Sequence, residues 1–186
     1  MLLQAQLDEL ARCGILPNEG VGISALLARH SERDYETDPF RLLLSVLGEQ
    51  AKHPPYAPLC NDLWHFKVGC IDGPGDYVHI AKRMATLAGK ALPIANIRDE
   101  FDLASGIAWL SFEILGQPVN WPARIREQWV DPTVFSRFVV LLESQDTAMR
   151  FTYFDLGGQD VLLGCATPSQ LMELRRRTGL NIQWLG

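Results

Sequence analysis

The sequence predicts an α+β fold, in which an N-terminal helical segment is followed by a mainly antiparallel sheet with packed helices. Apolar residues recur at helical spacing over residues 1–50, which favours helices there. Later in the chain, short apolar runs are separated by glycine-containing turns, a pattern typical of strands joined by tight connections. A proline-rich stretch, His53–Pro58, cannot extend a helix or a central strand and separates the two patterns.

Length and composition predict a chain that folds by itself. It has 186 residues, of which 47% are apolar and 21% are charged, as in ordinary globular proteins. The formal net charge of −5 disfavours binding to nucleic acid and to anionic membranes. The N-terminus lacks a signal-peptide pattern, and no apolar run is long enough to span a membrane. We therefore expect a cytoplasmic protein with no cofactor, no nucleic-acid partner and no membrane partner.

The N-terminal segment is expected to contain three helices. The first is marked by apolar residues at helical spacing, namely Leu3, Leu7, Leu10 and Ala11. A second, short helix is expected over Ile23–His30. The third has the strongest start signal, because Asp38 fits an N-cap and Pro39 fits the first helical position.

The proline-rich connector, residues 51–61, divides the chain into the helical segment 1–50 and an α+β domain over 62–186. The two parts could also form one compact unit. The first strand of the α+β domain is expected over Leu63–Cys70, where large apolar side chains alternate with polar ones such as His65.

Turn and capping signals predict the remaining elements. Further strands are expected over Ile97–Asp102, Ile107–Leu115, Pro118–Trp121, Arg150–Leu156, Val161–Cys165 and Asn181–Leu185. Helices are expected over Asp76–Ala88, from Asp131-Pro132 onward, and from Thr167-Pro168 to Gly179. The first three of these strands are expected to form an antiparallel meander, and Gly157-Gly158 is expected to turn a hairpin.

No motif in the sequence identifies an enzyme. It contains no phosphate-binding loop, dinucleotide fingerprint, nucleophile elbow or HExxH helix. The best candidate for a catalytic nucleophile is Cys165, with His65 or His79 as its base. Cys165 is in phase with Leu163, however, which favours a buried core thiol.

Asp155 and Asp160 are weak candidates for metal binding, because they flank the flexible Gly157-Gly158 turn. A hard cation requires six or more oxygen ligands, and the sequence lacks the acidic register of a calcium loop. An ordinary hairpin turn is the favoured interpretation.

Acidic and aromatic residues are the main candidates for a surface that binds a protein partner. Acidic side chains crowd two stretches, and two tryptophans lie in or near loops beside arginines, the residue types that typically anchor interfaces. These candidates are Glu32, Asp34, Glu36, Asp99, Glu100, Asp102, Trp121 and Trp129. The alternative is that the charges only solvate a face and that the tryptophans belong to the core.

Several runs resemble a family of uncharacterised bacterial proteins. They are Leu63-Trp64-His65-Phe66 with Cys70-Ile71, then Gly75–Val78, and finally Phe151–Asp160 with Gly164–Thr167. The resemblance covers most of the chain. It implies a bacterial, cytoplasmic setting and no catalytic residue. The size, acidity and absence of motifs are also similar in type to immunity proteins that neutralise secreted bacterial toxins.

The leading hypothesis is a non-enzymatic protein-binding module of the toxin–antitoxin kind, an immunity protein that binds a basic toxin domain. Such an inhibitor needs a rigid scaffold and complementary charge, which also speeds association. One alternative is an enzyme of unrecognised class that uses Cys165 or the Asp155/Asp160 loop. Another is a regulatory or scaffold domain. The oligomeric state is left open.

Overall fold

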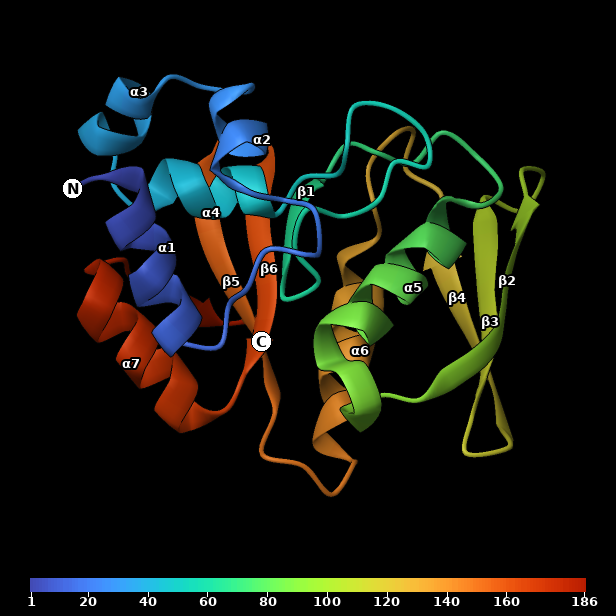
Figure 1. Cartoon of the computed structure of the whole chain (residues 1–186). Coiled ribbons are helices and arrows are strands. Elements are labelled where there is room, and N and C mark those ends of the chain that lie inside the picture. The colour runs from blue at the N-terminus through green and yellow to red at the C-terminus, as the bar shows by residue number, and fades with distance from the viewer. The chain divides into compact units, whose positions relative to one another are not determined.

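The computed structural model describes residues 1–186 and contains helices and two separate sheets (Figure 1). One sheet has four strands and the other has three. The strand pairs with a defined register are antiparallel. The predicted α+β class is therefore confirmed. None of the helices combines the length and the apolar character needed to cross a membrane.

The chain forms two compact units. Unit 1 consists of Met1–Phe66 and Phe151–Trp184, and unit 2 consists of Lys67–Arg150 and Leu185–Gly186. The sequence analysis placed the division at residues 51–61 instead. The difference has a physical reason, because apolar residues of the N-terminal helices share one core with residues near the C-terminus, and no local signal reveals such a long-range contact.

Unit 1 contains most of the helices and the four-stranded sheet. Its helices are α1 (Leu3–Arg12), α2 (Ile23–Leu27), α3 (Glu32–Thr37), α4 (Arg41–Leu47) and α7 (Pro168–Thr178). Its strands are β1 (Leu63–Lys67), β5 (Arg150–Gly157), β6 (Asp160–Ala166) and β7 (Gln183–Trp184), in the order β1-β6-β5-β7. Helices α1 and α7 lie side by side (Figure 1). Leu10 of α1, Leu44 of α4 and Leu171 of α7 belong to one buried core.

The acidic stretch after Ser31, where no helix was predicted, is helical in the structure. Ser31 and Asp34 form a capping box, in which the Ser31 hydroxyl accepts from the Asp34 N–H at 3.3 Å and the Asp34 carboxylate accepts from the Ser31 N–H at 2.9 Å. The sequence therefore carries a local signal for helix α3, namely Ser31 followed three residues later by Asp34.

The predicted start of the next helix at Asp38-Pro39 is wrong. Asp38 is the C-cap of α3, and its N–H donates to the carbonyl of Asp34 at 3.2 Å. Helix α4 begins only at Arg41, after Phe40, which has a φ of +63°. Two other elements are shorter than expected, since β1 ends at Lys67 and β7 comprises only Gln183–Trp184.

Unit 2 contains the predicted meander and three helices, one of which is a short 3-10 helix. Its strands β2 (Ile94–Asp102), β3 (Ile107–Ile114) and β4 (Gln117–Arg124) form an antiparallel sheet in the order β2-β3-β4. Its helices are α5 (Asp76–Ala88), the short 3-10 helix η1 (Gly89–Ala91) and α6 (Pro132–Glu143). Helices α5 and α6 lie on the same side of this sheet (Figure 1).

The central strand β3 separates a buried face of this sheet from an exposed one. Ala108, Leu110 and Phe112 are buried, whereas Trp109 between them is exposed. This alternation follows from the period of two along a strand. One face therefore packs against the helices, and the other face, which includes Trp109, is open to solvent.

The helix starts signalled by proline are confirmed for α6 and α7. The Asp131 carboxylate caps α6, with Pro132 in the first turn, and Thr167 forms a capping box at the start of α7, with Pro168 in its first turn. Gly179 ends α7 in the left-handed conformation. The hairpin of β5 and β6 is also confirmed, because the two strands are neighbours in the sheet and are separated only by Gly158 and Gln159.

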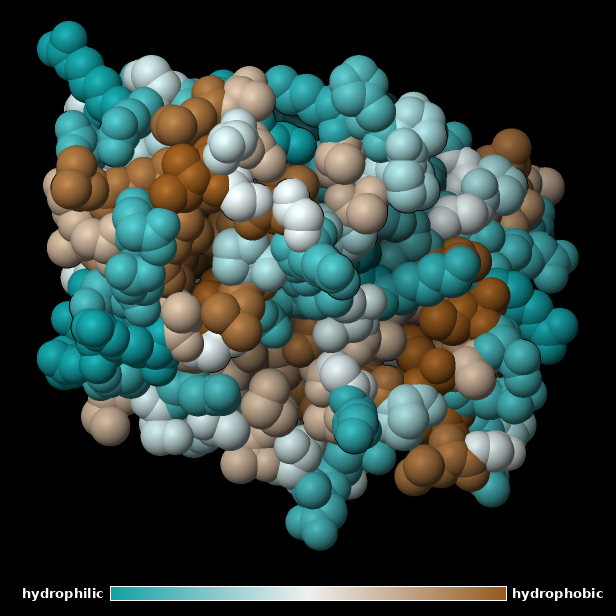
Figure 2. Space-filling view, viewed as in Figure 1, coloured by the Kyte–Doolittle hydropathy of each residue, from teal (hydrophilic) through white to brown (hydrophobic).

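Exposed apolar side chains are scattered over the surface. They include Leu103, Leu115, Val140 and Met172. On the face shown in Figure 2, hydrophobic residues form several separate groups among hydrophilic ones. Isolated apolar residues are ordinary on protein surfaces.

Candidate anion-binding pocket

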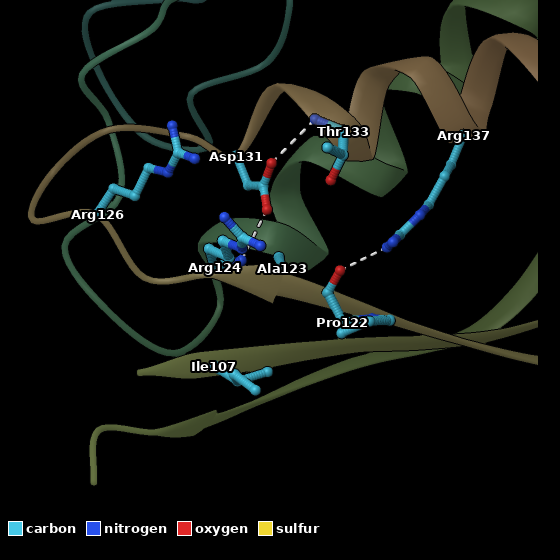
Figure 3. Close-up of a pocket in the computed structure, with 8 residues that line it drawn as sticks. All are labelled: Ile107, Pro122, Ala123, Arg124, Arg126, Asp131, Thr133 and Arg137. Atoms are coloured by element: carbon cyan, nitrogen blue, oxygen red, sulfur yellow. Dashed lines mark hydrogen bonds between the residues drawn. The ribbon is translucent and has the colours of Figure 1, made fainter. Parts of the chain in front are cut away.

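A pocket of about 430 Å³ lies in unit 2, where the end of β4 meets the start of α6 (Figure 3). Three of its lining residues are arginines and one is acidic. The lining residues are Ile107, Pro122, Ala123, Arg124, Arg126, Asp131, Thr133 and Arg137. The volume lies within the range of small-molecule sites, roughly 300–1,000 Å³.

A tight turn between β4 and α6 brings the pocket residues together. Strand β4 ends at Arg124, and the N–H of Trp129 then donates to the carbonyl of Arg126 at 2.9 Å. Glu127, inside the turn, has a φ of +53°, a left-handed conformation that is uncommon for residues with a side chain. The two arginines near the end of β4 are thereby placed close to the first residues of α6.

Asp131 connects the start of α6 to the end of β4. Its carboxylate accepts from the N–H of Arg124 at 2.7 Å and of Thr133 at 3.0 Å, and its own N–H donates to the Tyr77 hydroxyl at 3.1 Å. Burial would raise the pKa of this carboxyl, but the hydrogen bonds from Arg124 and Thr133 and the charge of Arg126 outweigh burial and lower the pKa. Asp131 is 4% exposed. The carboxyl group is therefore ionised at neutral pH, and both of its oxygens accept hydrogen bonds from backbone N–H groups.

The three arginines differ in how firmly they are held. Arg137 is partly buried, and its guanidinium donates to the carbonyl of Pro122. Arg124 and Arg126 are exposed, and neither guanidinium forms a hydrogen bond or an ion pair in the structure. Three guanidinium charges against the single carboxylate of Asp131 leave an excess of two positive charges at the pocket.

This arrangement is suited to binding an oxyanion. Guanidinium groups present planar pairs of donors that match the oxygens of carboxylates and phosphates. The lining contains no histidine, cysteine or lysine. Its one carboxylate already accepts hydrogen bonds from the backbone N–H groups of Arg124 and Thr133.

The predicted acidic residues of α3 divide into two kinds. Glu32 and Glu36 are exposed and form no ion pair. Asp34 is used within the protein, since hydrogen bonds from Ser31 lower the pKa of its carboxyl. Only Glu32 and Glu36 are therefore fully available to a partner.

The predicted acidic residues of β2 divide in the same way. The Asp99 carboxylate accepts from the N–H of Gly75 at 2.9 Å, of Tyr77 at 3.1 Å and of Val78 at 3.2 Å, and so caps the start of α5. Asp102 accepts from the two N–H groups of the following turn, those of Ala104 and Ser105. Glu100 is exposed. Asp99 and Asp102 therefore hydrogen-bond to backbone N–H groups of the protein itself. The density of acidic residues along the sequence does not distinguish such carboxylates from carboxylates that bind a partner.

The two predicted tryptophans lie in different environments. The Trp121 ring packs edge-on against Phe112, with 4.9 Å between ring centroids, and against Phe138, at 5.0 Å, on the helix-covered face of the sheet. Trp129 is 39% exposed, and its backbone pairs with that of Arg126 in an isolated antiparallel β-bridge. The structure thus places one of the two beside the pocket. Arg124 and Arg126, which are close in sequence to both tryptophans, line the pocket, and no local sequence signal predicts that pocket.

The weak catalytic candidates Cys165, His65 and His79 lie on β6, β1 and α5. In His65, Nε2 lies 3.2 Å from Asp160 Oδ1 and Nδ1 lies 3.3 Å from Ser45 Oγ, so both ring nitrogens have partners other than Cys165. Cys165 is half-buried on β6. His79 lies on α5 of unit 2, where burial, followed by the charge of Arg83, lowers the pKa of its imidazole.

The row of Ser45, His65 and Asp160 has residue types found in hydrolases, but its setting does not suit catalysis. Ser45 lies within helix α4, where backbone N–H groups are used by the helix itself and cannot stabilise an oxyanion.

The two aspartates considered for metal binding have other roles. Asp155 Oδ1 accepts from the N–H of Gly157 at 2.8 Å, and Asp160 pairs with His65. The structure contains no group of three or more His, Cys, Asp or Glu residues with the placement of a metal site.

Comparison with known proteins adds no relative to these observations. No family model, no curated protein and no solved structure matches this chain.

Proposed function

We propose that this chain is a binding protein that holds an anionic group of its ligand in the arginine pocket of unit 2. The observation that carries this proposal is the pair of exposed guanidinium groups of Arg124 and Arg126, which form no hydrogen bond or ion pair in the protein and line one pocket together with Arg137. An isolated surface arginine needs only water. Three arginines at one concave site, opposed by one carboxylate, favour a bound anion.

Two further observations support the proposal. The excess of acidic over basic residues lies mainly in unit 1, whereas acidic and basic residues are nearly equal in number in unit 2. The negative net charge of the chain therefore does not prevent the local attraction of an anion to unit 2. Trp129 lies exposed beside Arg126 and offers an aromatic contact at the pocket rim.

The double variant R124Q/R126Q is expected to weaken the binding of sulfate at least tenfold. Hydrogen bonds to charged groups contribute about 1.5–3 kcal/mol each, and about 1.4 kcal/mol corresponds to a factor of ten. Binding is measured from amide NMR shifts of residues 124–133 during titration with sulfate at constant ionic strength. The matched control is R33Q/K52Q, which removes two exposed positive charges from unit 1. Equal sulfate affinities for both double variants would contradict the proposal.

A second candidate function uses the acidic surface of unit 1. Glu32 and Glu36 are exposed on α3 without ion pairs, which fits docking of a basic protein partner. In this reading the chain is an immunity protein that binds a basic toxin. A toxin gene next to its own gene would favour this candidate, and a metabolic neighbourhood would count against it.

The variant E32K/E36K tests this second candidate with such a toxin as the partner. Association is expected to slow by about tenfold at low salt and to become less sensitive to salt, because exposed carboxylates steer a cationic partner. The melting temperature should change little, since neither side chain forms an ion pair. Stopped-flow association rates at two salt concentrations measure the effect. Rates equal to those of the unaltered protein would remove α3 from the interface.

A further inference from the structure

We infer that the ligand is a nucleoside monophosphate, whose phosphate is held by Arg124, Arg126 and Arg137 and whose base stacks on Trp109. The inference rests on the proposed function and deepens it, because it names the class of ligand. It follows from the charge of the pocket and from the arrangement of side chains on the exposed face of the adjoining sheet.

The charge of the pocket matches a phosphate monoester better than a carboxylate. The lining carries an excess of two positive charges, from three arginines and Asp131. A phosphate monoester has a charge of about −1.5 to −2 at pH 7, because its second pKa is about 6. A carboxylate would leave one positive charge of the pocket uncompensated.

The exposed face of the sheet continues from the pocket to an aromatic side chain. Trp109 of β3 is directly opposite Pro122 of β4, and Ile107 is directly opposite Arg124. Pro122, Ile107 and Arg124 all line the pocket. Trp109 is 36% exposed. By alternation along β3, its indole projects from the same open face of the sheet as the pocket residue Ile107, where a planar ring can stack on it.

The spacing between these two groups favours a ring joined to the phosphate through a spacer. Trp109 and Arg124 are diagonal neighbours across β3 and β4, and the Cα atoms of such positions lie about 7–8 Å apart. In a nucleoside monophosphate the sugar separates the base from the phosphate. A phosphate attached directly to a ring would not reach both groups equally well.

Charged residues on β2 limit the anion to the other edge of the sheet. Glu100 is opposite Trp109, and Asp102 is opposite Ile107. Their carboxylates make the end of β2 next to Trp109 and Ile107 acidic, with Arg98 further along the same face opposite Ser111, whereas Arg124 and Arg126 make the end of β4 basic. A ligand with its single anionic group at one end fits this gradient. Glu100 can also accept a hydrogen bond from an N–H group of a base.

Titration calorimetry with AMP, ribose 5-phosphate and adenosine tests the inference. We expect AMP to bind at least tenfold more tightly than either fragment, because only AMP occupies both the pocket and Trp109. AMP binding should tighten by about fourfold from pH 5.5 to pH 7.5, as the phosphate becomes a dianion. The lining contains no histidine, and Asp131 is ionised throughout this range, so adenosine binding should not follow the same pH dependence.

Variants separate the two halves of the site. W109A should weaken AMP binding about tenfold and leave ribose 5-phosphate binding unchanged, because stacking involves only the base. W109F, which keeps a ring, should lose less. The matched control is W184A, since Trp184 is equally exposed, at 36%, but lies in unit 1. R124Q/R126Q should weaken both AMP and ribose 5-phosphate.

Failure of this inference differs from failure of the proposed function. If W109A and W109F bind AMP as tightly as W184A, the base does not stack on Trp109, while sulfate binding still supports an anion pocket. If R124Q/R126Q binds sulfate and AMP unchanged, both proposals are wrong. A 5′-phosphorylated oligonucleotide is expected to bind more weakly than AMP, given the net charge of −5. Tighter binding of the oligonucleotide would overturn the assignment to a free nucleotide.

Discussion

Replacing Gln6 by leucine is expected to reduce the free energy of unfolding by about 3 kcal/mol, because unpartnered buried groups cost about 1–3 kcal/mol each. Gln6 is completely buried in α1. Its Nε2 donates to the carbonyls of Met1 and Tyr35, both at 2.9 Å, and its Oε1 accepts from the N–H of Phe40 at 2.8 Å. Leucine has a similar size but leaves the buried groups of Tyr35 and Phe40 without a partner.

Urea unfolding of Q6L measures this loss, and the melting temperature should fall by roughly 6–12 °C, at about 2–4 °C per kcal/mol for a chain of this length. The control is Q4L on the same helix, where the exposed Gln4 side chain hydrogen-bonds only to Asp8 at 2.7 Å. Equal urea midpoints for Q6L and Q4L would show that the buried amide does not hold α1 to the segment between α3 and α4.

Replacing Gly48 by alanine is expected to destabilise unit 1 by about 3 kcal/mol, at the upper end of overpacking effects. The backbone of Gly48 has a φ of −70°, which alanine adopts readily, so strain in the dihedral angles is not the cause. A Cβ at this position would lie 2.6 Å from the backbone nitrogen of His65 and 2.7 Å from Cδ1 of Leu162. Leu162 can rotate away, but the backbone of β1 cannot, because the His65 N–H donates to the Gly48 carbonyl at 2.8 Å.

The control for this substitution is G73A, at a glycine with no atom within 4 Å of the added methyl group. Urea unfolding of both variants, with the His65 ring protons followed by NMR, measures the effect. G48A should lower the urea midpoint and move the His65 signals, whereas G73A should change neither. A G48A protein as stable as G73A would mean that β1 and α4 can move apart at little cost.

Two of the three Asp-Pro or Thr-Pro signals predicted a helix start correctly, whereas Asp38-Pro39 did not. Asp131 and Thr167 cap helices that begin at the next residue, so the signal and the helix start are adjacent in sequence. The β5–β6 hairpin is likewise turned by residues that lie between its two strands. The structural role of Gln6 could not be predicted from local signals, because its side chain accepts a hydrogen bond from Phe40, which lies 34 positions away. Asp99 likewise caps α5 at Gly75, 24 positions away.

The pocket was missed for the same physical reason. Arg124 and Arg126 are close in sequence, but their relation to Arg137 depends on the turn at Glu127 and on the link from Asp131 to the end of β4. The sequence analysis weighed acidic residues by their density along the chain. Density does not reveal that Asp34, Asp99 and Asp102 are hydrogen-bonded to backbone N–H groups within the protein.

The discontinuous course of unit 1 has a consequence for the order of events on the ribosome. Unit 2 is almost entirely one continuous segment, Lys67–Arg150, whereas unit 1 needs both Met1–Phe66 and Phe151–Trp184. Chains are synthesised from the N-terminus and domains fold as units. The first segment of unit 1 must therefore wait, with apolar residues such as Leu44 and Leu10 incompletely covered, until Leu162 and Leu171 have been synthesised. Unit 2 can reach its native contacts first, although its sequence begins later.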